Sequence, residues 1–573
     1  MILQSLCNYY ARMIKDPQSG MPRPGFSTEK ISYALSLNPD GALAGVLDLR
    51  VKADKKLRPR LMSVPAAVKR ASNVAPNFLW DNTGYVLGVD GKGKAERTAS
   101  CFAAFKELHA KAAQDNPQPG LLAVIAFLEA WNPADFDDLT DIDPQEMRGD
   151  NCVFMWEETG DFIHDDPDIS KPSGDEVVTG RCLVSGEYGP IARLHSSIKG
   201  VWGGQSTGAS IVSFNASAFI SYGKEQSFNA PVCEKAATAY TSALNYLLNR
   251  DNRRCIQVGD ASTVFWAETT SRAEDLFLEL LDARAYAEKR EDGESVPETT
   301  AAGQVEALLG ELVKGVPIEK ALPDIDPDVR FFILGLAPNA ARISIRFWLV
   351  SDFGRLAANI ARHQADIAIE RQYENEPLFP PYWRMLLATA ALGKSENVLP
   401  PLASGLFRSI LEKTPYPQAL LAAVIGRIRA DQTVTHPRAA AIKGYLVRNL
   451  EKEISPMLDE AKKDLPYLLG RLFALLEKAQ ADALGKINKT IRDNYIGSAS
   501  TTPAVVFPRL LHLAQYHIAK SEYGGVTDRR IQDVMQSISG FPAHLKLEDQ
   551  GLFFIGYYHQ RNANYQKTAK QGE

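Results

Sequence analysis

Hydrophobic and polar residues alternate in the first part of the chain, whereas apolar residues recur every three or four positions in the last part. The clearest alternation falls in residues 31–51, where Ile31, Tyr33, Leu35 and Leu37 precede an Asn-Pro-Asp-Gly sequence and a second alternating run. Alternation with period two is typical of a half-buried strand, and this tetrapeptide is typical of a tight turn. We therefore predict a β-hairpin over residues 31–51.

The mixed pattern continues to about residue 375. Short apolar runs between Gly-rich or Asp-rich connections predict strands, and longer runs with helical spacing predict helices. Residues 1–16 have the spacing of an amphipathic helix packed on a core. Residues 287–304 are charged, rich in small residues and predict an exposed linker or loop. The other predicted strands lie in residues 151–158, 180–195, 208–214 and 262–268, and the other predicted helices in residues 97–114 and 233–249.

A second hairpin is predicted over residues 330–350, with its turn at the sequence Ala-Pro-Asn-Ala. In its second strand Arg342, Ser344 and Arg346 are predicted to share one face of the sheet. The other face is predicted to carry Ile343, Ile345 and Phe347. Two arginines on one sheet face can form a platform for phosphate groups, and they can equally be ordinary solvent-facing residues. The sequence leaves both interpretations open.

The pattern changes after the Pro-rich residues 373–383. From Arg384 to about Met535 the chain consists of amphipathic helical blocks joined by short turns, which is typical of an antiparallel bundle. We therefore expect an α+β protein. Residues 1–375 form a mixed N-terminal part with mainly antiparallel sheet, and residues 376–573 form a C-terminal α-helical bundle domain.

Charge is distributed unevenly along the 573 residues. The net charge of −5 and the pI of about 6.1, taken alone, argue against nucleic acid as the main partner. However, residues 50–70 contain eight Lys or Arg and one Asp, whereas residues 135–168 contain thirteen acids and one Arg. Such separation is typical of a protein that binds a polyanion at one place, although two solvated loops give the same pattern.

The six cysteines are scattered, and no Cys-x-x-Cys pair occurs, so a structural zinc site has little support. Scattered thiols are typical of a reducing compartment. The N-terminus lacks a signal-peptide pattern, and no apolar run approaches the ~18 residues needed to span a bilayer. We expect a cytoplasmic protein that does not enter the membrane.

One motif suggests catalysis. The sequence Gly204-Gln-Ser206-Thr-Gly208 matches the G-x-S-x-G pattern of a serine hydrolase, which requires a strand before the serine and a helix after it. Here the preceding residues are poor strand material, and the following residues resemble a strand, so the order is wrong. His164-Asp165 lacks further metal ligands, and residues 91–94 lack the frame of a P-loop. We predict no catalytic residue, metal or cofactor, and keep a serine hydrolase using Ser206 as the alternative.

Polar segments beside lysine and arginine residues remain as candidates for nucleic-acid binding. Lys and Arg bind phosphates, and short amide and hydroxyl side chains can hydrogen-bond base edges, although each of these residues also suits a turn or a helix cap. The candidates for contacts at or near the nucleobases of DNA are Lys69, Arg70, Ser72, Asn73, Asn77, Gln205, Ser206 and Asn215. The candidate phosphate contacts are Lys55, Lys56, Arg58, Arg60, Arg342 and Arg346.

Several segments in order along the chain carry a specific resemblance. They are the opening "MILQSLCNYY", "PNFLWDNTGYVLG" (76–88), the segment from "SIVSFNASAF" to "LNYLL" (210–248), "ILGLAPNAARISIRFW" (333–348), "TPYPQALLAAVIGRIRAD" (414–431) and "GLFFIGYYHQR" (551–561). Together they resemble the large subunit of the type I-C (Dvulg subtype) CRISPR interference complex, which is also called Cascade. The acidic residues 135–168 belong to none of these segments, and their role stays open.

The resemblance implies a non-catalytic subunit of a ribonucleoprotein complex for antiviral defence. Such a subunit recognises the protospacer-adjacent motif (PAM) in double-stranded target DNA, helps initiate unwinding and R-loop formation, and helps recruit a helicase–nuclease. Its implied partners are the CRISPR RNA, the backbone and crRNA 5′-end-binding subunits, and a small subunit identical to its own C-terminal part. We expect that small subunit to begin at Met457 and to contain 117 residues, 457–573. If the resemblance holds, the residues given above as candidates for contacts at or near the nucleobases are expected to lie near the PAM.

Overall fold

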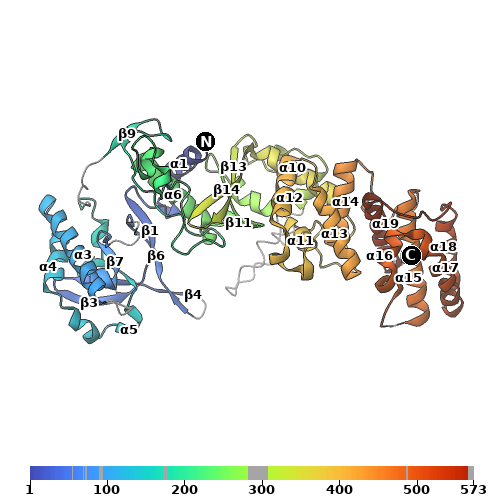
Figure 1. Cartoon of the computed structure of the whole chain (residues 1–573), viewed down its shortest axis with the longest axis horizontal. Helices are drawn as coiled ribbons and strands as arrows, with labels where there is room; N and C mark the ends of the chain where they lie inside the picture. Colours follow the sequence, from blue (N-terminus) through green and yellow to red (C-terminus); the bar gives the residue numbers. More distant parts are fainter. Residues whose placement is uncertain are drawn as a thin grey trace. The chain divides into compact units, whose positions relative to one another are not determined.

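The computed structural model describes residues 1–53, 56–68, 70, 74–89, 95–169, 171, 178–281, 307–485 and 488–565. The chain divides into two compact units (Figure 1). The first unit comprises residues 1–256, 261–268 and 333–348, and the second comprises residues 257–260, 269–332 and 349–573. The predicted linker at residues 287–304 lies outside the described residues. Strands lie in the first half and helices in the C-terminal part, so the predicted α+β class is confirmed.

The first unit combines short strands with six α-helices in its described residues. Its strands are β1 (Phe26–Ile31), β2 (Tyr33–Leu37), β3 (Leu43–Asp48), β4 (Val51–Ala53), β5 (Lys56–Arg58), β6 (Arg60–Pro65), β7 (Trp80–Asn82), β8 (Asn151–Trp156), β9 (Thr179–Arg181), β10 (Tyr188–Pro190) and β12 (Ala261–Ala267). Its helices are α1 (Ile2–Met13), α2 (Thr83–Val86), α3 (Ala95–Asp115), α4 (Pro119–Ala130), α5 (Pro144–Met147) and α6 (Glu234–Leu248).

The predicted hairpin over residues 31–51 is confirmed as β2 and β3, which belong to a four-stranded sheet in the order β3-β2-β8-β7. Gly41 lies in the turn with φ of +85°, and a Cβ there would lie 2.6 Å from the Ala126 Cβ on α4. Close approach to α4 and a left-handed backbone together explain the glycine. β8 runs parallel to β2 and antiparallel to β7, so this sheet is mixed.

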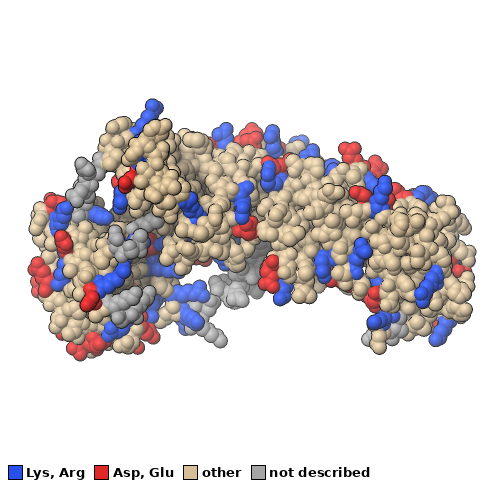
Figure 2. Space-filling model, in the orientation of Figure 1, with Lys and Arg blue, Asp and Glu red and all other residues tan. Residues whose placement is uncertain are grey.

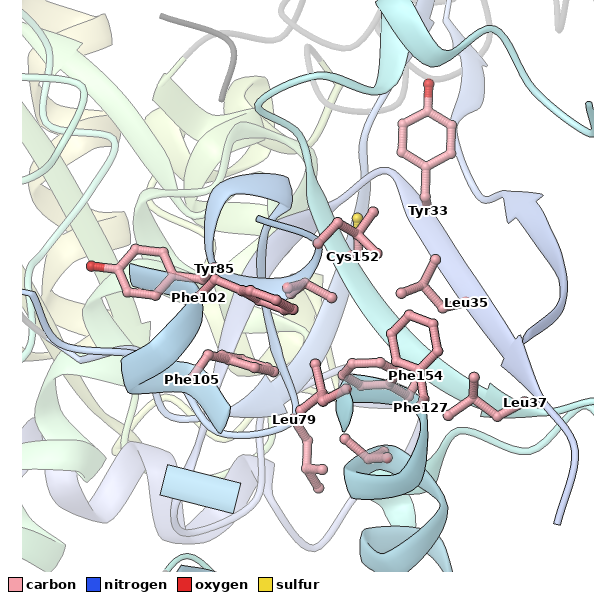
Figure 3. Close-up of a cluster of buried hydrophobic side chains, with 14 of the residues drawn as sticks. Tyr33, Leu35, Leu37, Leu79, Tyr85, Phe102, Phe105, Phe127, Cys152 and Phe154 are labelled. Atoms are coloured by element: carbon pink, nitrogen blue, oxygen red, sulfur yellow. The ribbon is translucent and has the colours of Figure 1, made fainter. Parts of the chain in front are cut away.

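Both faces of this sheet are covered. Tyr33, Leu35 and Leu37 pack into a large core with Phe127 and Phe154 (Figure 3). Successive strand residues point to opposite faces, so Ala34 lies in a second, smaller core with Val64 of β6, Trp80 and Val153. Ile31 also belongs to this second core, which corrects the prediction that it shares a face with Tyr33. Residue 32 separates β1 from β2 and changes the direction of the alternation.

Two ribbons extend the first unit beyond this sheet. β1 pairs with β6 in antiparallel register from Phe26↔Pro65 to Ile31↔Arg60, and β4 pairs with β5. The amphipathic helix predicted in residues 1–16 is confirmed as α1, which packs on α6 and buries Leu6, Tyr9 and Tyr10. The strand predicted in residues 208–214 is wrong, because only isolated bridges at Ala209 and Ser210 form there.

A second four-stranded sheet has the order β11-β12-β13-β14, with β11 (Cys255–Val258), β13 (Arg330–Asn339) and β14 (Arg342–Asp352). The predicted hairpin over residues 330–350 is confirmed as β13 and β14. Ala340 in its turn has φ of +51°. Ile343 and Phe347 are buried, whereas Arg346 is exposed and Arg342 is half-buried, which confirms the predicted faces at these positions. Ile345 is the exception, because 44% of its surface is exposed.

The second unit is mostly helical. Its helices are α7 (Ala273–Leu281), α9 (Ile318–Ala321), α10 (Phe353–Ile367), α11 (Tyr382–Leu387), α12 (Pro400–Glu412), α13 (Gln418–Asp431), α14 (His436–Leu450), α15 (Leu465–Leu484), α16 (Ile491–Thr501), α17 (Pro503–Lys520), α18 (Gly524–Met535) and α19 (Leu547–Tyr565). The helical pattern therefore begins before Arg384 and continues beyond Met535. α10 packs against α12 and α14, so helices on both sides of residue 376 share one compact unit.

Two glycines allow α15 and α19 to pack very closely. A Cβ at Gly470 of α15 would overlap the Phe553 carbonyl oxygen, and a Cβ at Gly556 of α19 would overlap the Tyr467 carbonyl oxygen. Any larger side chain at either position must force the helices apart. Around this contact the helices bury Phe473, and Glu477 accepts a 2.6 Å hydrogen bond from the Tyr557 hydroxyl.

Candidate nucleic-acid interface

The basic residues 50–70 form the β4–β5 ribbon and β6. Lys56, Arg58 and Arg60 are exposed, and Lys55 lies outside the described residues. Val51 and Leu57 are also about half exposed, at 50% and 51%, although they lie on opposite faces of the ribbon. A ribbon that exposes an apolar residue on each face contributes little to a core, and exposed apolar and basic side chains together are typical of a binding surface. Figure 2 shows Lys and Arg gathered where Figure 1 labels β4.

Acidic residues anchor the base of this ribbon. Arg50 donates to Asp48 at 2.7 Å and to Glu146 at 2.9 Å, and the contact with Arg50 holds the pKa of Asp48 below its usual value. Glu146 belongs to the acidic residues 135–168, and Asp141 of the same segment accepts a 3.2 Å hydrogen bond from the Val46 backbone N–H. Part of the acidic segment therefore positions β3 and Arg50, the basic residue that precedes the ribbon. Lys56, Arg58 and Arg60 remain exposed.

Arg70 and Asn77 point inward and organise the candidate segment that follows the ribbon. Arg70 Nη1 donates to Asp81 Oδ1 at 3.1 Å, its Nη2 contacts Asp81 Oδ2, and its Nε donates to the Ala75 carbonyl at 2.6 Å. The Arg70 guanidinium also lies 4.1 Å from the centre of the Tyr85 ring. Asp81 is 1% exposed, so this pair is a buried structural contact rather than a free cation.

Asn77 closes the same segment from its other end. Its Oδ1 accepts a 2.9 Å hydrogen bond from the Val68 backbone N–H, and its own backbone N–H donates to Asp81 Oδ2 at 2.9 Å. Asn77 is 4% exposed. The described residues on both sides of residues 71–73 are thus fixed to one buried carboxylate. Lys69, Ser72 and Asn73 lie outside the described residues.

A buried histidine fixes the strand end beyond this segment. Leu79 has φ of +61°, an unfavourable value for a leucine, and its backbone N–H donates to His109 Nε2 at 2.9 Å. His109 Nδ1 lies 2.7 Å from the Phe105 carbonyl oxygen, which fixes the tautomer with the proton on Nδ1. Burial lowers the pKa of His109 to about 4. A neutral histidine thus holds the backbone of Leu79 in its strained conformation.

The second candidate segment, residues 197–209, forms a loop whose ends are pinned. Ile198 and Ala209 exchange backbone hydrogen bonds of 2.8 and 2.9 Å, and Asn245 of α6 accepts from the Lys199 N–H at 2.8 Å. Gln205 and Ser206 are exposed at the tip of the loop, and Gly208 has φ of +86°. The loop therefore presents polar side chains from a fixed base.

Neighbouring residues on β1 bring the two candidate segments together. Glu29 Oε2 accepts a 2.7 Å hydrogen bond from Lys199 Nζ at the base of the 197–209 loop. Ser27 Oγ accepts a 3.1 Å hydrogen bond from the Ala67 backbone N–H, and donates to Glu29 Oε1 at 3.3 Å. Ser27 and Glu29 lie two positions apart on β1 and therefore share a face. Segments that are about 130 residues apart in the sequence converge on this pair, which we call the Ser27–Glu29 junction.

Asn215, Arg342 and Arg346 form a separate group. Arg342 donates to Asn215 Oδ1 at 2.8 Å, and its guanidinium lies 4.9 Å from the centre of the Phe219 ring. Arg346 is exposed on the same face of β14. Near Phe219, Tyr222 is fully exposed at 100% with φ of +51°. Sequence reasoning missed Tyr222, Ser27 and Glu29, since no motif singles out a turn residue or a strand residue whose partners lie far away in the chain.

The surroundings of Ser206 differ from those of a serine nucleophile. Turn residues precede and follow it, with neither a strand before it nor a helix after it in residues 200–216. His164 is buried and stacks on Phe162, and burial lowers its pKa, while Asp165 pairs with Arg23 at 3.5 Å. Among the described residues, no group of three or more His, Cys, Asp or Glu side chains is arranged to hold a metal ion. Within the same residues, none of the helices has the length and apolar character needed to cross a membrane.

A comparison with family models gives one match. The model described as CRISPR-associated protein (Cas_Csd1) matches residues 6–565, nearly the whole chain. No curated protein matches the chain.

Proposed function

This chain belongs to the Csd1 family of CRISPR-associated proteins, and on this premise we propose that it is the non-catalytic large subunit of a type I-C RNA-guided surveillance complex. In this proposal it recognises the PAM in double-stranded target DNA, helps initiate unwinding and R-loop formation, and helps recruit the helicase–nuclease. Its partners are the CRISPR RNA, the backbone and crRNA 5′-end-binding Cascade subunits, and a small subunit made from its own C-terminal part. It acts in the cytoplasm.

The observation that supports this proposal best is the Ser27–Glu29 junction. It holds the base of the 197–209 loop and the start of the segment around residues 69–77 on one strand. That strand pairs with β6, which begins at Arg60 and follows the basic β4–β5 ribbon. Guide pairing reads most of the target in RNA-guided complexes, so the protein needs only a local surface for a short motif and the DNA backbone. A basic ribbon beside two polar loops has that composition, although the net charge of the chain is negative.

Within this surface we assign different roles to the candidate residues. Lys55, Lys56, Arg58 and Arg60 contact phosphates, as do Arg342 and Arg346. Lys69, Ser72, Asn73, Gln205, Ser206 and Asn215 lie near the PAM, and exposed Tyr222 joins them as a contact to the DNA. Arg70 and Asn77 act indirectly, because their polar groups bind Asp81 and the neighbouring backbone.

The test uses the complete complex with its guide loaded, and two duplexes that differ only in the PAM. Asn73→Ala should weaken binding to the PAM duplex more than binding to the other duplex. A fourfold variant should weaken binding to both duplexes equally; it combines Lys55→Ala, Lys56→Ala, Arg58→Ala and Arg60→Ala. The slope of log K against log salt concentration should become shallower by about 0.9 for each phosphate that is no longer neutralised. Lys15→Ala with Lys111→Ala, two exposed bases elsewhere in the first unit, is the control. Equal losses on both duplexes would exclude Asn73 as a base-reading residue.

The alternative, a serine hydrolase using Ser206, rests on the G-x-S-x-G motif and the exposure of Ser206. A fluorophosphonate probe distinguishes the two. Labelling of the wild-type chain that Ser206→Ala abolishes would favour the hydrolase. We expect no labelling, because residues 200–216 do not form the strand, sharp turn and helix that expose and activate such a serine.

The separate small subunit is proposed to start at Met457, an exposed residue between α14 and α15. α15 to α19 contact one another, but α19 also packs on α13 and α14, where Gly551 faces Leu421 of α13 and Ile442 and Leu446 of α14. A fragment of residues 457–573 would uncover this apolar face of α19, so we expect it to be stable only when another subunit covers it. Replacing the Met457 codon by a leucine codon should remove a C-terminal fragment of 117 residues from expressing cells.

A further inference from the structure

Three cysteines that are far apart in the sequence lie close together in the first unit. Cys182 follows β9, Cys233 precedes α6, and Cys7 lies on α1. The hairpin of β9 and β10 is held against residues 231–233 by two backbone hydrogen bonds of 2.9 Å, from Leu183 to the Pro231 carbonyl and from Ala192 to the Val232 carbonyl. Cys182 and Cys233 are therefore fixed side by side by the backbone.

The sulfur of Cys182 is surrounded by donors. It accepts a 3.2 Å hydrogen bond from the Cys233 backbone N–H and a 3.5 Å hydrogen bond from the Ser185 backbone N–H. Donors that converge on one sulfur stabilise a thiolate rather than a thiol. They outweigh burial and lower the pKa of Cys182 to about 7, whereas the pKa of Cys233 is raised by burial and by Cys182.

The pair lies just below the surface. Cys182 is 2% exposed and Cys233 7%, but Ser185 beside them is exposed, and its hydroxyl lies 4.0 Å from the Cys233 sulfur. Small molecules such as hydrogen peroxide and dimedone can therefore reach the pair after a small movement of the Ser185 side chain.

Cys7 is the competing partner. Its thiol donates to the Ala236 carbonyl at 3.5 Å, and burial together with the two neighbouring cysteines raises its pKa to about 12. Cys7 is thus held as a thiol directed at the α6 backbone, whereas Cys233 is held next to Cys182, because its backbone N–H donates to the Cys182 sulfur. This difference favours Cys233 as the partner of an oxidised Cys182.

We propose that Cys182 and Cys233 form a peroxide-sensitive thiol pair that closes to a disulfide. The Cys182 thiolate attacks the peroxide, so that an S–O bond forms, the O–O bond breaks, and hydroxide leaves and takes up a proton as water. The Cys233 thiol then loses its proton, and its sulfur attacks the sulfenic sulfur of Cys182. The S–S bond forms, the S–O bond breaks, and a second water leaves. Two electrons pass from the thiol pair to hydrogen peroxide, which is reduced to water.

The disulfide would join the two ends of residues 183–232. That segment carries the 197–209 loop and exposed Tyr222. The redox state of the thiol pair would therefore determine whether the ends of the segment that carries these parts of the proposed interface are covalently joined. The chemistry itself does not depend on the proposed function, and it is tested on the full chain without DNA.

The test is peptide mapping after oxidation. The reduced full-length protein is treated with hydrogen peroxide, free thiols are blocked, and the protein is digested with trypsin. Cys182 then lies in residues 182–193, Cys233 in residues 225–235 and Cys7 in residues 1–12, so each disulfide gives a distinct linked peptide. We expect the 182–193/225–235 peptide to form at least tenfold faster than any product at Cys255, a half-buried thiol whose pKa burial raises to about 11. Dithiothreitol should reverse it.

Variants keep the proposal falsifiable if one of them folds poorly. Cys182→Ser should abolish the linked peptide and leave Cys233 reduced. Cys233→Ser should instead leave a sulfenic acid on Cys182, which dimedone traps, and Cys255→Ser should behave as the wild type. Linkage of Cys7 to either cysteine, or recovery of Cys182 as a free thiol from wild-type protein in which Cys255 is already oxidised, would overturn the proposal. So would failure of dimedone to label the Cys233→Ser variant.

Discussion

The two compact units of this chain are built in different ways. In the second unit, helices bury whole faces against one another, and two glycines let α15 and α19 approach until only hydrogen fits between them. In the first unit, long loops are held by a small number of polar contacts between distant residues, such as Lys199 with Glu29 and Arg342 with Asn215. The difference teaches that close helix packing determines stability in the second unit, whereas a few hydrogen bonds determine the arrangement of the candidate interface.

The largest effect is expected where the helices pack most closely. Gly556→Ala should destabilise the second unit by about 3 kcal/mol, because the new methyl group meets the Tyr467 carbonyl rather than a side chain that can move. Gly426→Ala on α13 is the matched control, since no atom lies within 4 Å of its Cβ. There the better helix propensity of alanine should stabilise by about 0.5–1 kcal/mol. Urea unfolding followed by hydrogen exchange of each unit measures both; similar effects of the two variants would contradict this account of the packing.

In the first unit the largest effect is expected from the buried ion pair. Arg70→Ala leaves Asp81 at 1% exposure without its cation and should destabilise the first unit by about 2 kcal/mol, less than for a fully buried pair because Arg70 is 26% exposed. Arg60→Ala, at an exposed base of β6, should change stability by less than about 0.5 kcal/mol. Thermal unfolding of the first unit measures the difference. Equal stability of the two variants would mean that Arg70 is not a structural residue.

The sequence predicts these two kinds of structure unequally. Periodicity predicts α1, the hairpins β2–β3 and β13–β14, and the helices between Arg384 and Met535, because each follows from contacts between neighbouring positions in the chain. It does not predict α7, α10 or α19 of the second unit. It fails at Ile31, where one intervening residue reverses the faces, and at residues 208–214, where apolar residues form no strand. Motif reasoning selects Arg70 and Asn77 by residue type, but their burial depends on Asp81 and Val68, which no local pattern reveals.

Acid should affect the second unit through its buried histidines. His363 is 2% exposed, its Nδ1 lies 2.6 Å from the Tyr416 hydroxyl oxygen, and burial together with Arg448 lowers its pKa to about 3. The unfolded chain binds a proton near pH 6.5, whereas the folded chain does not until about pH 3. The contribution of neutral His363 to the free energy of unfolding is therefore fully present above pH 6.5 and is lost as the pH is lowered. We expect the free energy of unfolding to fall by about 2 kcal/mol between pH 7 and pH 5.

His363→Gln removes this titration and should flatten the pH dependence of unfolding, even if the variant is less stable at pH 7. The control His512→Gln, at an exposed residue of α17, should leave the dependence as in the wild type. Urea midpoints at pH 7, 6 and 5 for the three proteins test this. Parallel curves for His363→Gln and the wild type would show that His363 is not the group that takes up the proton.

The smallest effect on stability, and the most informative for the interface, is expected at the Ser27–Glu29 junction. The Lys199–Glu29 pair is partly exposed, at 43% and 13%, so Glu29→Gln should reduce stability by no more than about 1 kcal/mol. Its effect on DNA binding should be larger, because losing the ion pair detaches the 197–209 loop from β1, while the backbone bonds at the base of the loop remain and no residue proposed to touch DNA is removed. We expect a five- to tenfold loss of affinity for the PAM duplex by the complete complex.

Glu396→Gln, which removes the more exposed Lys394–Glu396 pair of the second unit, is the matched control and should leave affinity unchanged. A double-mutant cycle that combines Glu29→Gln with Lys199→Met separates the effect of the ion pair from the effect of each residue alone. If the ion pair is what matters, the double variant should lose no more affinity for the PAM duplex than either single variant. Additive losses would mean that Lys199 contacts DNA directly. The loop would then be a second basic surface rather than a part positioned by β1, and the first unit would depend less on single polar contacts than the comparison with the second unit implies.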